Sequence, residues 1–196
     1  KPQFSPVASD LKPGFNAFDP GYDYLELLKV SDGLAVFVKK GPGPEDRTIR
    51  IYGFMSRTGE VVIPARYSDV NVFSEGIASC AIYDPNRPAH QPYGHEERNC
   101  EHFVWGAIDT KGRTVIPFQY DYIGPLCDGL ARVCVDGMWG YMDRTGKVVI
   151  PPQFSSAYSF RDGLAIVAVE GDGKLSVIDK SGRIVVRTDI EEHPLL

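Results

Sequence analysis

One stretch of the chain recurs three more times, and this repetition limits the possible folds more than any other feature does. Residues 138–151 run from Trp139-Gly140 through an Asp-x-x-Gly turn to Val-Ile-Pro. The same order stands at 104–117 and 51–64, and in diverged form at 174–186. A second signature, Asp/Glu-Gly-Leu/Ile-Ala, accompanies the copies at 32–35, 75–78, 128–131 and 162–165. Such self-similarity indicates an array of supersecondary units that stack to bury a common core.

The spacing between the two signatures separates a constant half of the unit from a variable half. In each of the three clear copies the Trp-Gly glycine, or its equivalent Gly53, lies 23 residues before the glycine of the next Asp/Glu-Gly, as Gly140 does before Gly163. In the other direction, from Asp/Glu-Gly forward to the Trp-Gly position, the separation is 20, 30, 11 and 13 residues in successive copies. All length variation therefore falls in one connection. Insertions in a repeat array gather on one face, which is often the binding face.

These motifs carry a resemblance to a known family. Trp-Gly, Asp-x-x-Gly, Val-Ile-Pro, an aromatic residue three positions on and Asp-Gly-Leu-Ala resemble the WG-repeat (KWG) family, a bacterial β-repeat module. The resemblance covers about residues 22–186. It implies a repeat scaffold that serves as a binding or interaction module, and it brings no catalytic residues with it.

Each unit is predicted to hold three short strands. In the third copy these are residues 130–135, 139–143 and 147–150, with Asp136-Gly137 as a type I′ turn and with Pro151 and Pro152 ending the last strand. We expect the Trp-Gly glycines to sit where a neighbouring backbone or ring approaches closely. One unit is too small to bury both faces. The predicted fold is therefore all-β, with tandem three-stranded units stacked as an open repeat array, and a small closed propeller-like ring is the alternative.

A continuous array offers no boundary that few contacts cross, so residues 1–196 are predicted to form a single domain. We expect a capping arm at 1–21 anchored by Phe4, Phe15 and Phe18, a half repeat at 22–33, four repeats at 34–186 and a tail at 187–196. Residues at equivalent positions of the copies should form the core. They are Tyr52, Trp105, Trp139, Ile63, Ile116, Ile150, Tyr67, Tyr120 and Phe154.

The charge balance bears on the class of partner. The chain carries 21 Lys and Arg against 26 Asp and Glu, a formal net charge of −5 at pH 7. Because nucleic-acid binding relies on clustered Lys and Arg that displace counterions, we expect no nucleic-acid partner. No apolar run reaches the roughly 18 residues of a membrane span, so we expect no transmembrane segment. The first residue, Lys1, fits a processed secretory precursor or a shortened chain, and a periplasmic or secreted location is favoured over a cytoplasmic one.

The cysteines and histidines show no metal signature. Cys80, Cys100, Cys127 and Cys134 lack Cys-x-x-Cys spacing, and we expect free, largely buried thiols, with a Cys80–Cys100 disulfide as the alternative. A metal site would draw on soft and borderline ligands in one long connection, but their spacing matches no known site, so neither metal nor cofactor is expected. Those ligands are His95, Cys100 and His102 with Glu96 or Glu101.

A row of acidic residues offers the other candidate chemistry. Asp109, Asp143 and Asp179, with Ser56 in the first copy, each stand three residues before a glycine. A row of carboxylates can serve acid–base catalysis or calcium binding, but at this turn position a carboxylate accepts N–H bonds of its own turn. The chain also lacks a Gly-x-Ser-x-Gly elbow, a Gly-rich phosphate loop and His-Glu-x-x-His. We therefore expect no enzymatic activity.

Two long connections occupy the same place in neighbouring units and form the candidate binding site. Residues 39–47 are a charged Gly/Pro loop, and residues 82–103 hold three of the four histidines. Structureless loops beyond about 12 to 15 residues are uncommon in compact domains and are usually functional or disordered. An extension without function is the simpler reading of the second loop. The candidate partner-binding residues are Lys39, Lys40, Glu45, Asp46, Arg47, Tyr83, Arg87, His90, Tyr93, His95, Arg98 and His102.

The predicted function is a non-enzymatic module that binds another protein through these loops. Tyr, Arg and His suit protein interfaces, and stacking should bring the two loops together. A more specific hypothesis is an inhibitor or immunity protein that blocks a secreted toxin. The alternative is a small-ligand or polysaccharide-binding envelope module, which would use exposed aromatic residues along the sheet.

Overall fold

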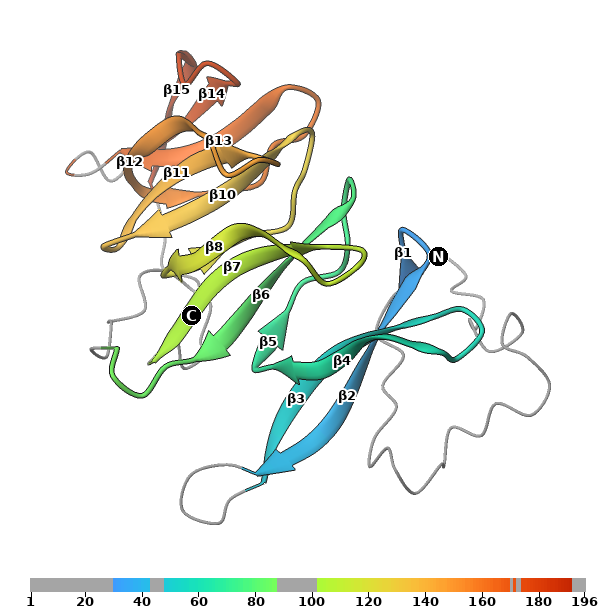
Figure 1. The fold of residues 1–196 in the computed structure, drawn as a ribbon. Helices are drawn as coiled ribbons and strands as arrows, with labels where there is room; N and C mark the ends of the chain where they lie inside the picture. Colours follow the sequence, from blue (N-terminus) through green and yellow to red (C-terminus); the bar gives the residue numbers. More distant parts are fainter. Residues whose placement is uncertain (1–29, 43–47, 88–101, 170, 172–173, 192–196) are drawn as a thin grey trace.

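The computed structural model describes residues 30–42, 48–87, 102–169, 171 and 174–191 (Figure 1). These residues form fifteen β-strands in three open antiparallel sheets, and they contain no helix. The sheets follow one another along the molecule in chain order (Figure 1). The open all-β array is therefore confirmed, and none of these sheets closes into a ring.

The first sheet is unit one, and it contains β1 (Val30–Ser31), β2 (Leu34–Pro42), β3 (Thr48–Ser56) and β4 (Val61–Tyr67). The second sheet is unit two, with β5 (Asp69–Val70), β6 (Ile77–Tyr83), β7 (Phe103–Asp109) and β8 (Thr114–Tyr120). The third sheet holds units three and four, which share one long strand. Its strands are β9 (Tyr122–Ile123), β10 (Leu130–Val135), β11 (Met138–Asp143), β12 (Val148–Ala157), β13 (Leu164–Val169), β14 (Lys174–Asp179) and β15 (Ile184–Glu191).

The predicted turns form as their residues require. Asp136 and Gly137 both have positive φ, +50° and +78°, as a type I′ turn demands. In the Asp-x-x-Gly turn of unit three, the Asp143 Oδ1 atom accepts hydrogen bonds from the backbone N–H groups of Thr145 and Lys147, at 2.8 and 3.1 Å. Asp109, Asp179 and Ser56 accept equivalent bonds in their own turns. These side chains serve the turns, as the sequence predicts.

A wide bulge explains the glycine of Trp-Gly. Tyr141 pairs with Ile150 and Trp139 pairs with Phe154, so Gly140 stands opposite the three residues 151–153. The backbone of the bulge lies directly against the glycine. A Cβ atom built on Gly140 would lie 2.5 Å from the Ile150 carbonyl oxygen and 2.6 Å from the Pro152 nitrogen. The expected close approach is confirmed, since Gly53 likewise meets the Ile63 carbonyl oxygen and the Ala65 nitrogen, and Gly106 meets the Ile116 carbonyl oxygen and the Phe118 ring.

The prediction that Pro151 and Pro152 end the third strand is wrong. Strand β12 runs from Val148 to Ala157 and contains both prolines. The reason is the bulge, because residues 151–153 have no ladder partner and a missing N–H breaks no bond there. The second half of β12 then pairs with β13, which joins unit four to unit three. In the earlier units a short separate strand, β5 or β9, makes the equivalent connection.

The hydrophobic core lies between successive units. Units two, three and four each insert an apolar side chain, Phe73, Leu126 and Phe160 respectively, beside the first residue of the preceding unit's long first strand, which is Leu34, Ile77 or Leu130. The rings of Phe54 and Phe73 meet edge to face at 4.7 Å, as do those of Tyr141 and Phe160. A unit alone would leave these groups exposed, so burial depends on stacking.

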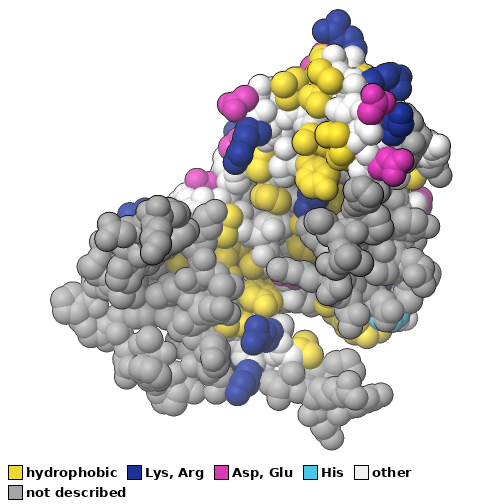
Figure 2. Space-filling view, turned by 180° about the vertical axis from the view of Figure 1, so that it is seen from behind, with side chains coloured by type: hydrophobic (Ala, Val, Ile, Leu, Met, Phe, Trp, Pro, Cys, Tyr) yellow, Lys and Arg dark blue, Asp and Glu magenta, His cyan; other side chains and the backbone are white. Residues whose placement is uncertain are grey.

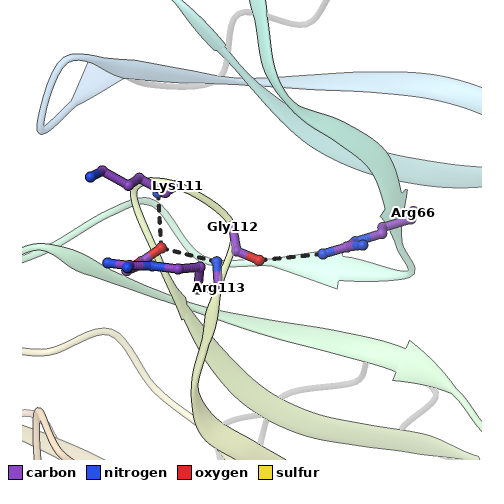
Figure 3. Close-up of polar contacts among 5 residues, drawn as sticks. Arg66, Lys111, Gly112 and Arg113 are labelled. Carbon is purple, nitrogen blue, oxygen red and sulfur yellow. Dashed lines mark hydrogen bonds and ion pairs between the residues drawn. The ribbon is translucent and has the colours of Figure 1, made fainter.

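The turn glycines form a second repeated contact between units. A Cβ atom built on Gly112 would lie 3.3 Å from a side-chain carbon of Ile63 in the preceding unit. Gly146 and Gly182 stand in the same way over Ile116 and Ile150, at 3.3 and 3.2 Å. The guanidinium of Arg66, on β4 of unit one, points to the carbonyl of Gly112 in the turn of unit two and donates a hydrogen bond of 3.4 Å to it (Figure 3).

A row of acidic side chains forms a third contact between units, which we call the carboxylate ladder. The Asp32 Oδ2 atom accepts a hydrogen bond of 2.8 Å from the Gly76 N–H in unit two. Glu75 accepts an equivalent bond of 3.0 Å from Gly129, and Asp128 accepts one of 2.6 Å from Gly163. The acid of each Asp/Glu-Gly turn therefore holds the next turn of the same type. The sequence repeats these residues without revealing that they bond between units.

Some expected features fall elsewhere in the structure. Trp105, Trp139, Tyr67, Phe154 and the three isoleucines are buried, whereas Tyr52 and Tyr120 are only partly buried. Strand β15 extends to Glu191, so the predicted tail at 187–196 begins inside a strand. The predicted arm at 1–21 and most of the half repeat at 22–33 lie outside the described residues. The single-domain boundaries remain a prediction.

The hydrogen bond from the Gly163 N–H, followed by the Lys180 ammonium group, holds the pKa of Asp128 below its ordinary value of 3.8. A depressed folded-state pKa stabilises the fold above the unfolded pKa, and this contribution is lost as pH falls through the folded value. We expect the melting temperature of the parent to fall below about pH 4. Asp128→Asn should reduce this acid dependence. Asp162→Asn is the matched control, because Asp162 accepts no such bond from another described residue, and equal curves for Asp128→Asn and the parent would contradict the prediction.

Candidate functional site

The hairpin ends that carry the predicted binding loops lie on one edge of the array. The β2–β3 and β6–β7 ends point the same way, and so does the β10–β11 turn (Figure 1). Five of the twelve predicted residues are described, namely Lys39, Lys40, Tyr83, Arg87 and His102. The others, Glu45, Asp46, Arg47, His90, Tyr93, His95 and Arg98, lie outside the described residues.

The β2–β3 hairpin presents a basic group that includes one residue missed from the sequence. Lys39 and Lys40 are exposed near the end of β2, and Lys40 pairs directly with Arg50 on β3. Arg50 is also exposed, and none of the three makes an ion pair with another described residue. Like charges directly opposite each other across two strands destabilise a hairpin. Arg50 was identifiable only through the hairpin register.

The base of the β6–β7 connection is closed by specific hydrogen bonds. The Asp84 N–H donates to the His102 carbonyl at 2.7 Å, and the His102 Nδ1 atom lies 2.7 Å from the Arg87 carbonyl oxygen. His102 has positive φ, +71°, which turns the chain back into β7. The Tyr83 ring meets His102 edge to face at 5.8 Å and remains 44% exposed. Tyr83 therefore stands on a hydrogen-bonded base, and His102 builds that base.

The Arg87 side chain bonds to residues of the β scaffold. Its guanidinium forms an ion pair with the carboxylate of Asp121, which precedes β9 of unit three, and donates to the Tyr120 carbonyl at 3.3 Å. Its side chain is 17% exposed. The sequence predicts Arg87 as a partner contact, but these bonds give it the role of fixing the connection to the boundary of units two and three. Whether it also contacts a partner remains a prediction.

Three of the four cysteines lie in the described residues, and so does His102 among the possible metal ligands. Cys80, Cys127 and Cys134 are free thiols, so the alternative Cys80–Cys100 disulfide is absent from this structure. Burial raises the pKa of the Cys80 thiol well above its usual range. Across the described ranges, no three His, Cys, Asp or Glu side chains come together as metal ligands. His95, Glu96, Cys100 and Glu101 lie outside those ranges.

The described part of the chain offers no helix of the length and apolarity that crossing a membrane requires.

The exposed aromatic side chains of the described residues are few, with only Tyr83 and Tyr158 among the exposed large hydrophobic residues. The other exposed large hydrophobic residues are Val, Leu and Ile.

Comparison with known proteins agrees with the repeats seen in the fold. A family model described as a WG containing repeat matches residues 52–79, 105–139 and 139–171. Each match begins in the Trp-Gly strand of one unit, or in its Tyr52-Gly53 equivalent, and runs into the following unit, so the three matches extend from unit one to unit four. No curated protein and no solved structure matches the chain significantly. With three successive matches, and with the glycine of Trp-Gly and the turn that follows it in the same structural role in the three clear copies, the chain belongs to the WG-repeat family.

Proposed function

We propose that this WG-repeat protein is a non-enzymatic module that binds another protein through the edge formed by the β2–β3 and β6–β7 ends. The observation that carries the proposal is the exposed basic group of Lys39, Lys40 and Arg50, on the same edge as a long connection whose base is closed by hydrogen bonds. Tyr83 adds an exposed aromatic side chain to the same edge. Aromatic residues and Arg are enriched where proteins bind each other.

The charges favour a partner with an acidic surface. The protein as a whole carries a net charge of −5, so three cations on one hairpin that form no ion pair with another described residue stand out against that balance. Keeping Lys40 opposite Arg50 costs stability, and an acidic partner would offset this repulsion in the complex. Complementary charge also raises the rate of association, and the effect weakens with salt.

The absence of enzymatic activity is part of the proposal. Asp109, Asp143 and Asp179 have pKa values below their ordinary range because hydrogen bonds within their turns stabilise the carboxylates. These perturbed groups are therefore engaged in turns, where they support no acid–base chemistry. The more specific hypothesis of an inhibitor or immunity protein fits such a rigid scaffold with one binding edge. A polysaccharide-binding role has less support, because the described sheet faces expose few aromatic rings.

The first test removes the second loop but keeps its base. Because Arg87 and His102 are in contact, residues 88–101 can be replaced by a Gly-Asn-Gly link without disturbing Asp84, Arg87 or His102. Affinity capture from the native organism should recover a specific partner with the parent and lose it with this variant. A short-loop variant that folds and keeps every partner of the parent would contradict the proposal.

The second test reverses the basic group. Lys40→Glu/Arg50→Glu should weaken binding of the captured partner by about tenfold or more, and the parent's affinity should fall with added salt. Arg57→Glu/Arg144→Glu is the control, because it makes the same change in net charge at exposed turn residues in β3–β4 and β11–β12. Equal weakening by both pairs, measured by titration calorimetry, would show that only net charge matters and would refute this site.

A further inference from the structure

The end of unit four exposes side chains that every earlier unit buries. Val186 occupies the position of Ile63, Ile116 and Ile150, and it is 51% exposed whereas Ile150 is 1% exposed. Leu164 occupies the position of Leu34, Ile77 and Leu130, and it is 44% exposed whereas Leu130 is 7% exposed. Unit four therefore presents the same half of the unit-to-unit interface, and the described residues leave it exposed.

A pocket lies where the next unit would insert its apolar side chain. It has a volume of about 770 Å³, and its lining includes Phe160, Asp162, Leu164, Ile166 and Val177. Leu164 and Val177 stand at the positions of Leu130 and Tyr141, which hold Phe160 between them in the preceding interface. The pocket is thus the equivalent of a socket that is filled by Phe73, Leu126 or Phe160 elsewhere in the array.

The carboxylate ladder has a fourth acidic side chain at the same place. Asp32, Glu75 and Asp128 each accept the N–H of a turn glycine in the following unit. Asp162 stands at the fourth position and is exposed, and it has no hydrogen-bond partner in the described part of the chain. Its backbone has the same positive φ, +52°, as the other three acids. The carboxylate is therefore oriented by the same turn but holds no N–H group of the described residues.

The last strand completes this surface. Strand β15 is the edge of the third sheet and, among the described strands, pairs with β14 alone, while the equivalent strand β12 also pairs with the first strand of the next unit. Hydrophobic side chains gather on the upper part of the molecule, where the C-terminal strands lie (Figure 2). Exposed Val185, Val186 and Ile190 belong to β15.

We propose that the end of unit four is a second interaction surface, which receives a β unit of the same repeat type from another polypeptide chain. The three interfaces within the protein indicate which residues that unit must contain. It needs an apolar side chain such as Phe or Leu, followed three residues later by a glycine in a tight turn, as in Phe160-Arg161-Asp162-Gly163. The apolar side chain fills the pocket, and the glycine N–H binds the Asp162 carboxylate. This surface is separate from the loop edge, so the proposal stands independently of the proposed function.

A cyclic peptide supplies the test, since the Tyr158 N–H bonds to the Ile166 carbonyl and residues 158–166 can be closed on themselves. Titrated into the full-length ¹⁵N-labelled protein, this peptide should shift the amide resonances of Asp162, Leu164 and Val177 with a dissociation constant of about 1 mM or lower. A peptide with Phe160→Ala should not bind. In the protein, Asp162→Asn should weaken binding about tenfold, as loss of one charge-assisted hydrogen bond does.

Two controls decide the outcome. Leu164→Glu should abolish binding, whereas Val115→Glu, a charge at an exposed apolar position of unit two, should not. A chain with residues 155–190 repeated after Ile190 should shield the methyl groups of Leu164 and Val186 from a soluble paramagnetic probe that reaches them in the parent. No peptide-induced shifts, shifts that survive Leu164→Glu, or methyl groups that stay open in the lengthened chain would overturn the proposal.

Discussion

Gly140→Ala should destabilise the protein by about 3 kcal/mol or more, although it adds only one methyl group. The added Cβ atom would lie 2.5 Å from the Ile150 carbonyl oxygen and 2.6 Å from the Pro152 nitrogen. Both are backbone atoms, and the prolines at 151 and 152 limit how the bulged strand can move away. Urea unfolding followed by tryptophan fluorescence measures the change in the free energy of unfolding.

A second glycine separates this clash from ordinary backbone strain. Gly129 has φ of +81°, and nothing lies within 4 Å of a Cβ atom built on it. Gly129→Ala should therefore cost only the strain of a left-handed residue, about 1 to 2 kcal/mol. If Gly140→Ala lowers the free energy of unfolding no more than Gly129→Ala does, the close approach of the bulge is not the reason for a glycine at position 140.

Trp139→Ala should cost roughly 3 to 5 kcal/mol, as loss of a large buried side chain does. Trp139 is 8% exposed, pairs across the sheet with Phe154 and meets the Tyr122 ring edge to face at 5.7 Å. The Arg132 guanidinium lies 5.1 Å from the Trp139 ring centroid. The substitution leaves a cavity between units three and four and removes a cation–π contact. Differential scanning calorimetry gives the change in melting temperature.

The equivalent residue in the first copy provides the comparison. Tyr52 pairs with Tyr67 at the same bulge, but it is only partly buried. Tyr52→Ala should therefore cost less than Trp139→Ala. A Trp139→Ala variant that melts within a degree or two of the parent would place this side chain outside the core.

The local structure of each unit was predictable because its chemistry is local. A type I′ turn needs two residues with positive φ, and Asp136-Gly137 meets that need within the turn itself. The acid of Asp-x-x-Gly likewise bonds within five residues, from Asp143 to Lys147. Four similar copies then show that these units are stacked, since one unit cannot bury its own apolar residues.

The remaining features depend on register or on residues far apart in the chain. The sequence offers Pro151 and Pro152 as a strand end, and only the register of β11 and β12 reveals the bulge that admits them. Arg50 belongs to the proposed binding edge because it pairs with Lys40. The sequence alone does not show this pairing, because the loop between the two strands conceals their register. Arg87 looks like a free cation until its bond to Asp121, 34 residues away, is seen.

The carboxylate ladder gives the array a direction. At every interface the earlier unit supplies the acid and the later unit supplies the glycine N–H, so the two contacting faces are different. A contact of this head-to-tail kind does not close on itself in the way a two-fold symmetric contact does. Tandem duplication of one unit therefore adds a matching interface at both of its ends, and the protein can lengthen in evolution without any contact being redesigned.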